Sequence, residues 1–590
     1  MMLHGADATP PRFATLGAML RHAAAHSAPS DGLVFVGLDE SETAYSWREV
    51  RDRAARAAAA LVRRGVKPGD RVALVLPTSI GFMDAFFGTL LAGAVPVPLY
   101  PPVRLGRLDE YLAATVRALR LVRARLLVTD GQVRPILGTV VEQAGCDAVR
   151  VEQLADAEPG IELDAEPGTL GLIQFSSGST LDPRAVALTH AQLLAQCEAL
   201  CRVMRDCPGN TGVGASWLPL YHDMGLIGCL LSAAYHPGRL VLIAPEHFLA
   251  KPALWLRAIA RHRAFISPAP NFAYAVCANR VRDADIAGLD LSCWQLALNG
   301  AEPVLASTLD AFTARFGSFG FDGRALMPVY GLSEAALAVT FSPPGRGARA
   351  SARGAMSVGM PLPGFTVRIA GEDGTELPDG VEGRVLCRGP SVMHGYFRDA
   401  HATSAALRDG WLDTGDLGFI ENGELHISGR ARDVIIIRGA NHMPQQFEEA
   451  LLDLHGLRPG CAVAVGELSS EEGSEGLLIL AERARQPALT DAELEVAVST
   501  RILERTGIRA RRVLLLAPGT LPRTSSGKLR RAEAAMRMRA GTLSAPGGVN
   551  AWTLAPALIR SALSWLRIGR RETTERQQRD NRETTEGGER

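Results

Sequence analysis

Residues 171–180 join an apolar stretch to a turn built of hydroxyl and glycine residues. The apolar run over 172–175 predicts a strand, and it leads into Ser176, Ser177, Gly178, Ser179 and Thr180. Small residues let the backbone approach a polyphosphate closely, and hydroxyl and N–H groups donate to its oxygens. The Gly-Lys-Ser/Thr ending of a Walker A loop is absent. The pattern indicates a phosphate-binding turn of another kind, with an ordinary loop as the alternative.

Lysine is scarce in this chain, which makes each lysine informative. There are three, Lys67, Lys251 and Lys528, against sixty arginines. Arginine replaces lysine well on solvated surfaces, but not where chemistry needs a compact ammonium donor. Lys67 lies in a Pro-Gly-Asp turn and Lys251 is expected to begin a helix, so both are assigned to the surface. Lys528 lies in an arginine-rich loop and is the candidate for chemistry; the alternative is a solvated lysine.

The elements that must position these residues alternate between strand and helix. The pattern predicts a helix, a strand, a helix and a strand over residues 46–64, 71–76, 82–92 and 95–99. The same rhythm recurs to about residue 340, which indicates parallel sheets covered by helices. From 366 to 428 short alternating strands dominate, with turns at Glu372-Asp-Gly, Pro378-Asp-Gly and Glu421-Asn-Gly.

After Gly429 the pattern returns to mixed α/β for about a hundred residues. We therefore predict an α/β protein whose large N-terminal domain, residues 1–428, has parallel-rich sheets with helices plus a β-rich subdomain. A joint at 429–433 connects it to a small α+β C-terminal domain at 434–540, whose mobility the resemblance described below implies. Residues 541–590 form a further segment.

Bulk properties narrow the class of protein. The 590 residues are 47% hydrophobic and 21% charged, with Lys+Arg and Asp+Glu both at 63, so no charge excess points to nucleic acid. Nine cysteines are scattered without CxxC pairs, which predicts neither a disulfide scaffold nor a zinc site. No secretory signal or bilayer-spanning run is recognisable. We expect a soluble, cytoplasmic, monomeric protein with at most peripheral membrane contact.

The phosphate turn and four later segments resemble the adenylate-forming (AMP-binding) superfamily, which includes acyl-CoA synthetases, peptide-synthetase adenylation domains and luciferases. The later segments occur in the superfamily's order: Tyr330-Gly-Leu-Ser-Glu, Trp411-Leu-Asp-Thr-Gly-Asp, Gly429-Arg-Ala-Arg-Asp and Pro522-Arg-Thr-Ser-Ser-Gly-Lys. One departure is Arg184, which stands where relatives usually carry lysine and keeps the positive charge. The resemblance covers almost the whole chain.

The resemblance implies ATP and Mg²⁺ as cofactors and assigns roles by position. Tyr330 would stack on adenine beside Gly331, and Glu334 would bind Mg²⁺, with Thr180 as a further candidate ligand. Asp416 would accept the ribose hydroxyls, with Arg430 as a second ribose contact. The loop of Asn299, Gly300 and Ala301 would contact the purine edge.

The resemblance also implies a mechanism. A carboxylate attacks the α-phosphorus of Mg·ATP, pyrophosphate leaves, and Lys528 bridges the carboxylate and the α-phosphate as charge builds. The C-terminal domain then rotates about residues 429–433, with Arg432 as the pivot, so that a thiol reaches the adenylate.

Three segments resemble one branch, the fatty acyl-AMP ligases, which pass fatty acids to the phosphopantetheine of an acyl carrier protein. They begin at Trp217-Leu-Pro-Leu-Tyr-His, Ser267-Pro-Ala-Pro-Asn-Phe and Arg438-Gly-Ala-Asn-His. His222 would face the reacting carboxylate; the alternative is a turn histidine that bonds to backbone. Apolar residues of 217–232 and 267–276 would line a hydrophobic acyl tunnel.

One departure from the sequence pattern of this branch leaves the identity of the acyl acceptor undecided. The ligases carry an insertion after the Tyr-Gly-Leu-Ser-Glu segment, whereas Thr340 to Ser357 here form only a short Gly/Arg/Ala-rich linker. A fatty acyl-CoA ligase that uses coenzyme A is therefore the alternative. A non-catalytic adenylate-binding protein would need a broken site, yet Thr180, Glu334, Asp416 and Lys528 are all present.

The C-terminal segment has an amphipathic part and a polar tail. Arg560, Ser564, Arg567 and Arg571 fall on one helical face, and Leu558, Ile559, Ala562, Leu563 and Leu566 on the other. Such a helix could rest on a membrane, dock a carrier protein or pack against its own domain. The tail from 570 is too polar to offset its ordering entropy, so we expect it to be disordered.

Overall fold

The computed structural model describes residues 2–102, 107–155, 157–158, 160, 162–163, 165–176, 184–205, 207–437, 440–468, 475–485, 489–524, 528–546 and 554–568. The chain forms two compact units. Unit 1 comprises residues 1–50 and 166–545, and unit 2 comprises residues 51–165 and 546–590. Each unit is described by itself below.

Unit 1 is organised around a nine-stranded sheet. Its strands, in spatial order, are β16 (Met360–Pro361), β15 (Ala338–Phe341), β14 (Leu326–Gly331), β13 (Leu296–Asn299), β12 (Ile266–Ala269), β10 (Val213–Ser216), β11 (Arg239–Ile243), β2 (Gly32–Val36) and β3 (Glu42–Ser46). The strands from β14 to β2 pair in parallel, and the edge pairs are antiparallel. Parallel strands place their carboxyl ends at one edge of a sheet, where ligands of open α/β folds commonly bind.

Helices connect these strands and supply much of the core. They are α1 (Leu16–His26), α7 (His190–Arg205), the π-helix η3 (Met224–Leu231), α8 (Ser232–Tyr235), α9 (Pro245–Ala250), α10 (Ala253–His262), α11 (Asn271–Arg280) and α12 (Ala306–Phe316). Trp255, Tyr274, Trp294 and Phe312 are fully buried, and their rings pack edge to face at centroid distances of 5.1–6.0 Å. Large rings packed in this way make the scaffold beneath the site rigid.

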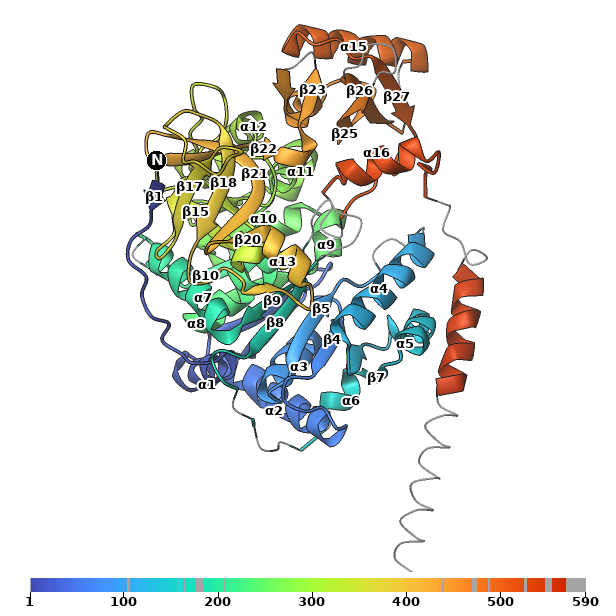
Figure 1. The fold of residues 1–590 in the computed structure, drawn as a ribbon. Coiled ribbons are helices and arrows are strands. Elements are labelled where there is room, and N and C mark those ends of the chain that lie inside the picture. Colours follow the sequence, from blue (N-terminus) through green and yellow to red (C-terminus); the bar gives the residue numbers. More distant parts are fainter. Residues whose placement is uncertain are drawn as a thin grey trace, which may run out of the picture. The chain divides into compact units, whose positions relative to one another are not determined.

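Two smaller sheets complete the N-terminal part of unit 1. One is antiparallel and contains β1 (Met2–His4), β17 (Thr366–Ala370), β18 (Gly383–Arg388), β20 (Leu407–Arg408), β21 (Trp411–Glu421) and β22 (Glu424–Arg430), drawn mostly in yellow to orange in Figure 1. The other contains β8 (Leu170–Phe175), β9 (Ala185–Thr189) and β19 (Gly395–Tyr396), with α13 (Ala400–Ala406) following. The predicted hairpin at Glu421-Asn-Gly is confirmed: Asn422 and Gly423 both have positive φ, as a two-residue turn requires.

Residues from 434 onward in unit 1 have cores of their own. The strands are β23 (Ile435–Ile437), β24 (Ala440–His442), β25 (Leu457–Leu468), β26 (Glu475–Arg483) and β27 (Arg512–Leu516), and the helices are α14 (Pro444–Glu449), α15 (Asp491–Thr506) and α16 (Arg531–Arg539). α15 begins with a capping box between Thr490 and Glu493. One apolar core lies under α15, and another lies under α16. This content agrees with the predicted α+β character, while the boundaries at 428, 433 and 540 stay predictions.

Unit 2 holds a four-stranded parallel sheet in the order β5 (Val95–Leu99), β4 (Arg71–Val75), β6 (Leu126–Thr129) and β7 (Asp147–Arg150). Its helices are most of α2 (Trp47–Arg63), α3 (Ile80–Leu91), α4 (Leu108–Val122), α5 (Gly138–Ala144), α6 (Glu152–Ala155) and a last helix over residues 554–568. The four elements predicted between residues 46 and 99 are confirmed. α3 begins two residues earlier than expected because Ser79 caps it by accepting from the Phe82 N–H.

Two further predictions from the sequence have other outcomes. Lys251 does not begin a helix: it ends α9, and its ammonium lies 2.7 Å from the Glu40 carboxylate. The predicted disordered tail from residue 570 lies outside the described residues. Within the described part of the chain, no helix is both long and apolar enough to cross a bilayer.

Gly331 fixes the turn that carries the predicted adenine and magnesium residues. A Cβ at this position would lie 1.8 Å from the Leu337 carbonyl oxygen, because β14 and β15 pair closely with a register shift beside it. Gly317, by contrast, has helical φ and ψ, and no atom lies within 4 Å of its Cβ position.

We expect Gly331→Ala to lower the free energy of unfolding by about 3 kcal/mol, because backbone must move to admit the methyl group. The matched control, Gly317→Ala, should be neutral or stabilise by about 0.4–1 kcal/mol. Denaturant midpoints of the two variants measure the difference. Equal midpoints would show that the turn is not held as described.

Candidate functional site

A cavity of about 660 Å³ lies within unit 1 beside the ends of β10, β12, β13 and β14. It has a polar end and an apolar arm. The sequence-predicted residues on its wall are Ser176, Arg184, His222, Ala301, Tyr330, Gly331, Glu334, Arg430, Arg432 and Lys528. These residues come from segments more than 300 positions apart, and the fold brings them to one place.

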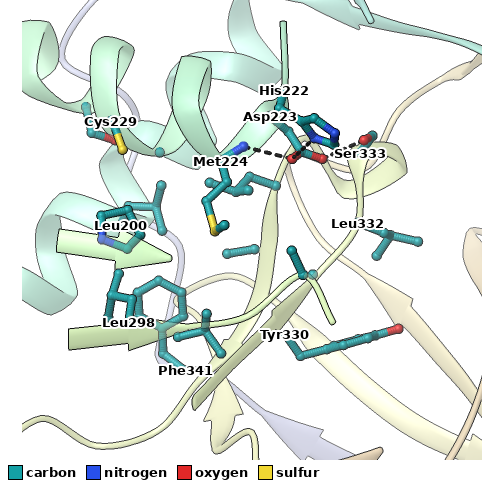
Figure 2. Close-up of a pocket in the computed structure, with 18 of the residues that line it drawn as sticks. Leu200, His222, Asp223, Met224, Cys229, Leu298, Tyr330, Leu332, Ser333 and Phe341 are labelled. Carbon is teal, nitrogen blue, oxygen red and sulfur yellow. Dashed lines mark hydrogen bonds and ion pairs between the residues drawn. The ribbon is translucent and has the colours of Figure 1, made fainter. Parts of the chain in front are cut away.

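Asp223 organises part of the polar end, as Figure 2 shows. Its carboxylate accepts from the Ser333 hydroxyl at 2.5 Å and from the Met224 N–H at 2.7 Å. The His222 Nδ1 lies 3.6 Å from the same carboxylate. Burial raises the pKa of Asp223, but His222, Ser333 and Lys528 act in the opposite direction and hold the pKa below its usual value. Asp223 is therefore an anion that orients His222.

Tyr330 and Asp416 join two sheets across the polar end. The Tyr330 hydroxyl donates to Asp416 at 2.7 Å, and the Arg430 Nε lies 3.2 Å from the other carboxylate oxygen. Asp416 and Arg430 are register partners on β21 and β22. Burial raises the pKa of Asp416, and the Arg430 charge opposes that shift. Asp416 is 7% exposed and supports Tyr330 from behind the cavity wall.

Glu334 lies at the other side of the same turn. The Tyr396 hydroxyl donates to it at 2.8 Å, and the Arg184 guanidinium lies 5.1 Å from the centre of the Tyr396 ring. Burial raises the pKa of Glu334 even though the hydrogen bond from Tyr396 lowers it. A carboxylate in such surroundings favours a nearby cation, since a cation would stabilise its ionised form. The hard oxygen donor fits Mg²⁺.

The loop after β13 has the shape expected of a close ligand contact. Ala301 has φ of +69°, a left-handed conformation that is costly for alanine, and a Cβ at Gly300 would lie 2.6 Å from Val329. Asn299 is fully buried; its amide donates to Asn271, while its Oδ1 has no partner in the described part of the chain. Asn299 and Gly300 lie behind Ala301 rather than on the cavity wall.

Lys528 lines the cavity; its N–H donates to the Thr524 hydroxyl, and its carbonyl accepts from the Thr524 N–H. Its side chain is half-buried. Removal from water lowers the pKa of Lys528, whereas the charges of Asp223, Glu302 and Asp416 raise it. The ammonium thus faces several carboxylates at the polar end.

The apolar arm begins at the π-helix η3. Met224, Gly228 and Ser232 recur every four residues and line it, together with Leu200, Cys229, Leu298 and Phe341 (Figure 2). A π-helix is rare and commonly marks a functional site. Gly228 widens the arm, because a Cβ there would lie 2.8 Å from Leu337.

The predicted tunnel lining is correct only in part. Met224, Gly228, Cys229 and Pro268 line the cavity, but Trp217 stacks on Phe248 at 4.0 Å and Tyr274 belongs to the aromatic core. Their size favours full burial, which the sequence pattern could not separate from tunnel lining. Ser177, Gly178, Ser179 and Thr180, and Arg438 of the branch segment, lie outside the described residues.

Sequence reasoning did not select Asp223 or Tyr396. Asp223 directly follows His222 in the sequence, so its adjacency was the available signal. Tyr396 had none, since its contact with Glu334 spans 62 positions.

A parallel-rich domain lies beside a cavity with a polar end and an apolar arm, and a small α+β region adds one lysine to the cavity wall. This arrangement is that of adenylate-forming enzymes. The sequence profile of the AMP-binding enzymes matches residues 20–397. The chain therefore belongs to the AMP-binding enzyme family.

Three individual comparisons place the chain more narrowly. It is 35% identical to a Caulobacter vibrioides protein named as a candidate acyl-CoA synthetase, over 85% of this chain and 91% of that protein. It is 32% identical to the medium-chain-fatty-acid–[acyl-carrier-protein] ligase JamA of Moorena producens, over 90% and 96%. A solved structure from work on fatty acyl-adenylate ligases of E. coli and L. pneumophila has a TM-score of 0.83 at 32% identity, covering 90% of this chain and 98% of that one.

Competitive acetylation can test the electrostatics at Lys528, because three lysines give a readable peptide map. We expect Lys528 to reach half its maximal reactivity below pH ~10.4, the ordinary lysine value, since burial lowers its pKa. Asp223→Asn removes a stabilising negative charge and should move that midpoint lower still. Mass spectrometry across a pH series, with Lys67 as the reagent reference, measures both.

Asp223→Glu is the matched control, because it keeps the charge and should keep the midpoint near that of the unmodified protein. A midpoint that rises in Asp223→Asn would contradict the placement of Lys528 opposite this carboxylate.

Proposed function

We propose that this protein activates a fatty acid as an acyl-adenylate, at the expense of ATP, and then transfers the acyl group to the phosphopantetheine thiol of an acyl carrier protein. The observation that carries the proposal is the two-part cavity. Its polar end gathers Lys528, His222 and Glu334, and its apolar arm continues along η3. A fatty acid has the same division between one charged end and an apolar chain.

In the proposed reaction the fatty acid carboxylate attacks the α-phosphorus of ATP, and the bond to pyrophosphate breaks. The ammonium of Lys528 stabilises the negative charge that builds between the carboxylate and the α-phosphate. His222, oriented by Asp223, faces the carboxylate. The chain thus contributes mainly positioning and charge stabilisation.

ATP would be held along the same wall. Tyr330 would stack on adenine and Ala301 would contact its edge, while Asp416 and Arg430 would take the ribose. Ser176 to Thr180 and Arg184 would bind the phosphates. Glu334, with Thr180, would hold Mg²⁺, which neutralises phosphate charge when bound.

In the second half-reaction, transfer of the acyl group, the phosphopantetheine thiol must enter the cavity after Lys528 has moved out of it. The joint at 429–433 is proposed to allow this, with Arg432 as the pivot. Arg432 is exposed, and its Nε lies 3.9 Å from the Asp433 carboxylate. Arg531, which lies 3.5 Å from Asp433 and 2.6 Å from Glu448, supports the C-terminal side of the joint.

The location of the protein in a reducing cytoplasm remains a prediction.

Pyrophosphate exchange tests the adenylation step. We expect fatty acids to stimulate exchange of labelled pyrophosphate into ATP, and Lys528→Arg to reduce it by about 10²–10³-fold, because a guanidinium cannot replace a compact ammonium donor. Lys251→Arg is the matched control and should leave exchange unchanged. Absence of exchange with every fatty acid would exclude the proposed activation.

A coenzyme A ligase is the second candidate, and the linker at 342–359 favours it. This short segment is fixed to β22: the Arg346 Nη2 donates to Glu424 at 2.8 Å, and Ser357 donates to the same carboxylate. Between β15 and β16 these residues, all of which are described, form turns and two isolated β-bridges but no helix or further strand. An insertion that hinders coenzyme A would therefore be missing here.

Supplying labelled fatty acid and ATP with either coenzyme A or a holo acyl carrier protein separates the two candidates. We expect thioester on the carrier and little acyl-CoA. Acyl-CoA formation at a rate equal to or above that of the carrier thioester would establish the second candidate instead.

A further inference from the structure

The last helix of unit 2, residues 554–568, is attached through its polar side. Ser561 and Ser564 are 0% and 2% exposed. The Ser561 hydroxyl accepts from the Gly138 N–H at 2.7 Å, and the Ser564 hydroxyl donates to Glu142 at 2.5 Å. A Cβ on Gly138 would lie 2.2 Å from the Ser561 carbonyl oxygen, so helix α5 and this helix meet at backbone distance.

Trp565 completes the attachment. Its indole N–H donates to the Arg134 carbonyl at 3.1 Å, and the Arg134 guanidinium lies 4.0 Å from its ring centre. These contacts fix the rotation of the helix about its axis.

The apolar side consequently faces away from the unit. Leu558, Ile559, Leu563 and Leu566 are 38%, 59%, 48% and 62% exposed. Their angular positions at 100° per residue cover one continuous arc. Amphipathic helices of globular proteins bury this side, so four large apolar side chains left in solvent on one helix require an explanation.

Two exposed arginines lie beside the arc. Arg560 and Arg567 border it, and their side chains are 57% and 64% exposed while they pair with Asp109 and Glu142 at 3.3 and 3.4 Å. From 554 to 571 the sequence holds four arginines and no acidic residue. Exposed ion pairs of this kind are weak, so the arginines can exchange partners.

We propose that the exposed apolar arc of residues 558–566 binds the surface of an anionic lipid bilayer, with the helix lying in the plane of the interface. Leucine and isoleucine side chains enter the headgroup boundary, and the bordering arginines extend to the lipid phosphates. A convex row on a single helix suits a planar interface, whereas a protein partner would have to supply a groove around it. The proposal goes beyond the proposed function and does not depend on it.

Vesicle co-sedimentation of the full-length protein tests the proposal. We expect binding to vesicles of phosphatidylcholine mixed with phosphatidylglycerol, weaker binding to pure phosphatidylcholine, and a decrease as salt screens the arginines. The double variant L563D/L566D should lower the partition coefficient by about 100-fold, since it removes two inserting side chains. Both positions are exposed, and an unchanged melting temperature verifies the fold.

The matched control is L503D/V496D on helix α15, where Leu503 and Val496 are 47% and 66% exposed. This variant should bind vesicles like the unmodified protein. Equal loss in both variants, or no vesicle binding at all, overturns the proposal.

Two other results would also overturn it by identifying a different occupant. One is a dimer in sedimentation velocity that L563D/L566D dissociates without any lipid effect. The other is loss of carrier thioester in that variant, in the absence of lipid, while pyrophosphate exchange is retained. Since exchange is measured separately, failure of the membrane proposal remains distinguishable from failure of adenylation.

Discussion

The site depends on one carboxylate that is taken out of water. Asp416 is almost completely buried, and it is stabilised there by the Tyr330 hydroxyl and the Arg430 guanidinium. These three residues tie β14 of the nine-stranded sheet to β21 and β22 of the antiparallel sheet. A buried charge with good partners is costly to uncouple, because removing one partner leaves the other unsatisfied. The contact therefore fixes the distance between the proposed adenine and ribose positions, and the chain leaves β22 directly into the joint at 429–433.

The surrounding charges follow from this arrangement. Asp223, Glu302, Glu334 and Asp416 lie around a cavity in which Lys528, Arg430 and Arg184 supply the positive charge. In a region of low dielectric such groups shift one another's pKa values, which is characteristic of sites that handle developing charge. The apolar arm along η3 is chemically separate from this cluster, so an amphiphilic acid has only one favourable orientation. Position and orientation of the substrate are then set before any bond changes.

Unit 2 illustrates a different constraint. Its last helix uses the Ser561 hydroxyl and the Trp565 N–H to satisfy backbone groups of α5 and η2 (Arg134–Ile136), and Gly138 permits the close approach. Once these polar groups are paired, the helix cannot rotate to bury its leucines without leaving them unsatisfied. Hydrogen bonds therefore determine the rotation of this helix about its axis, although burial of its apolar side chains would ordinarily be preferred.

The sequence by itself determined what is local. Strand and helix periods, the Asn-Gly hairpin and the types of residue in the five family segments follow from neighbours in the chain, and the resemblance supplied their order. Tertiary structure decided everything that rests on distant contacts. It placed Tyr396 on Glu334, set Asp223 between His222 and Ser333, moved Trp217 and Tyr274 from the tunnel to the core, and turned the apolar face of 554–568 outward. Periodicity identifies a face but not its partner, because the partner's shape and unpaired polar groups lie hundreds of residues away.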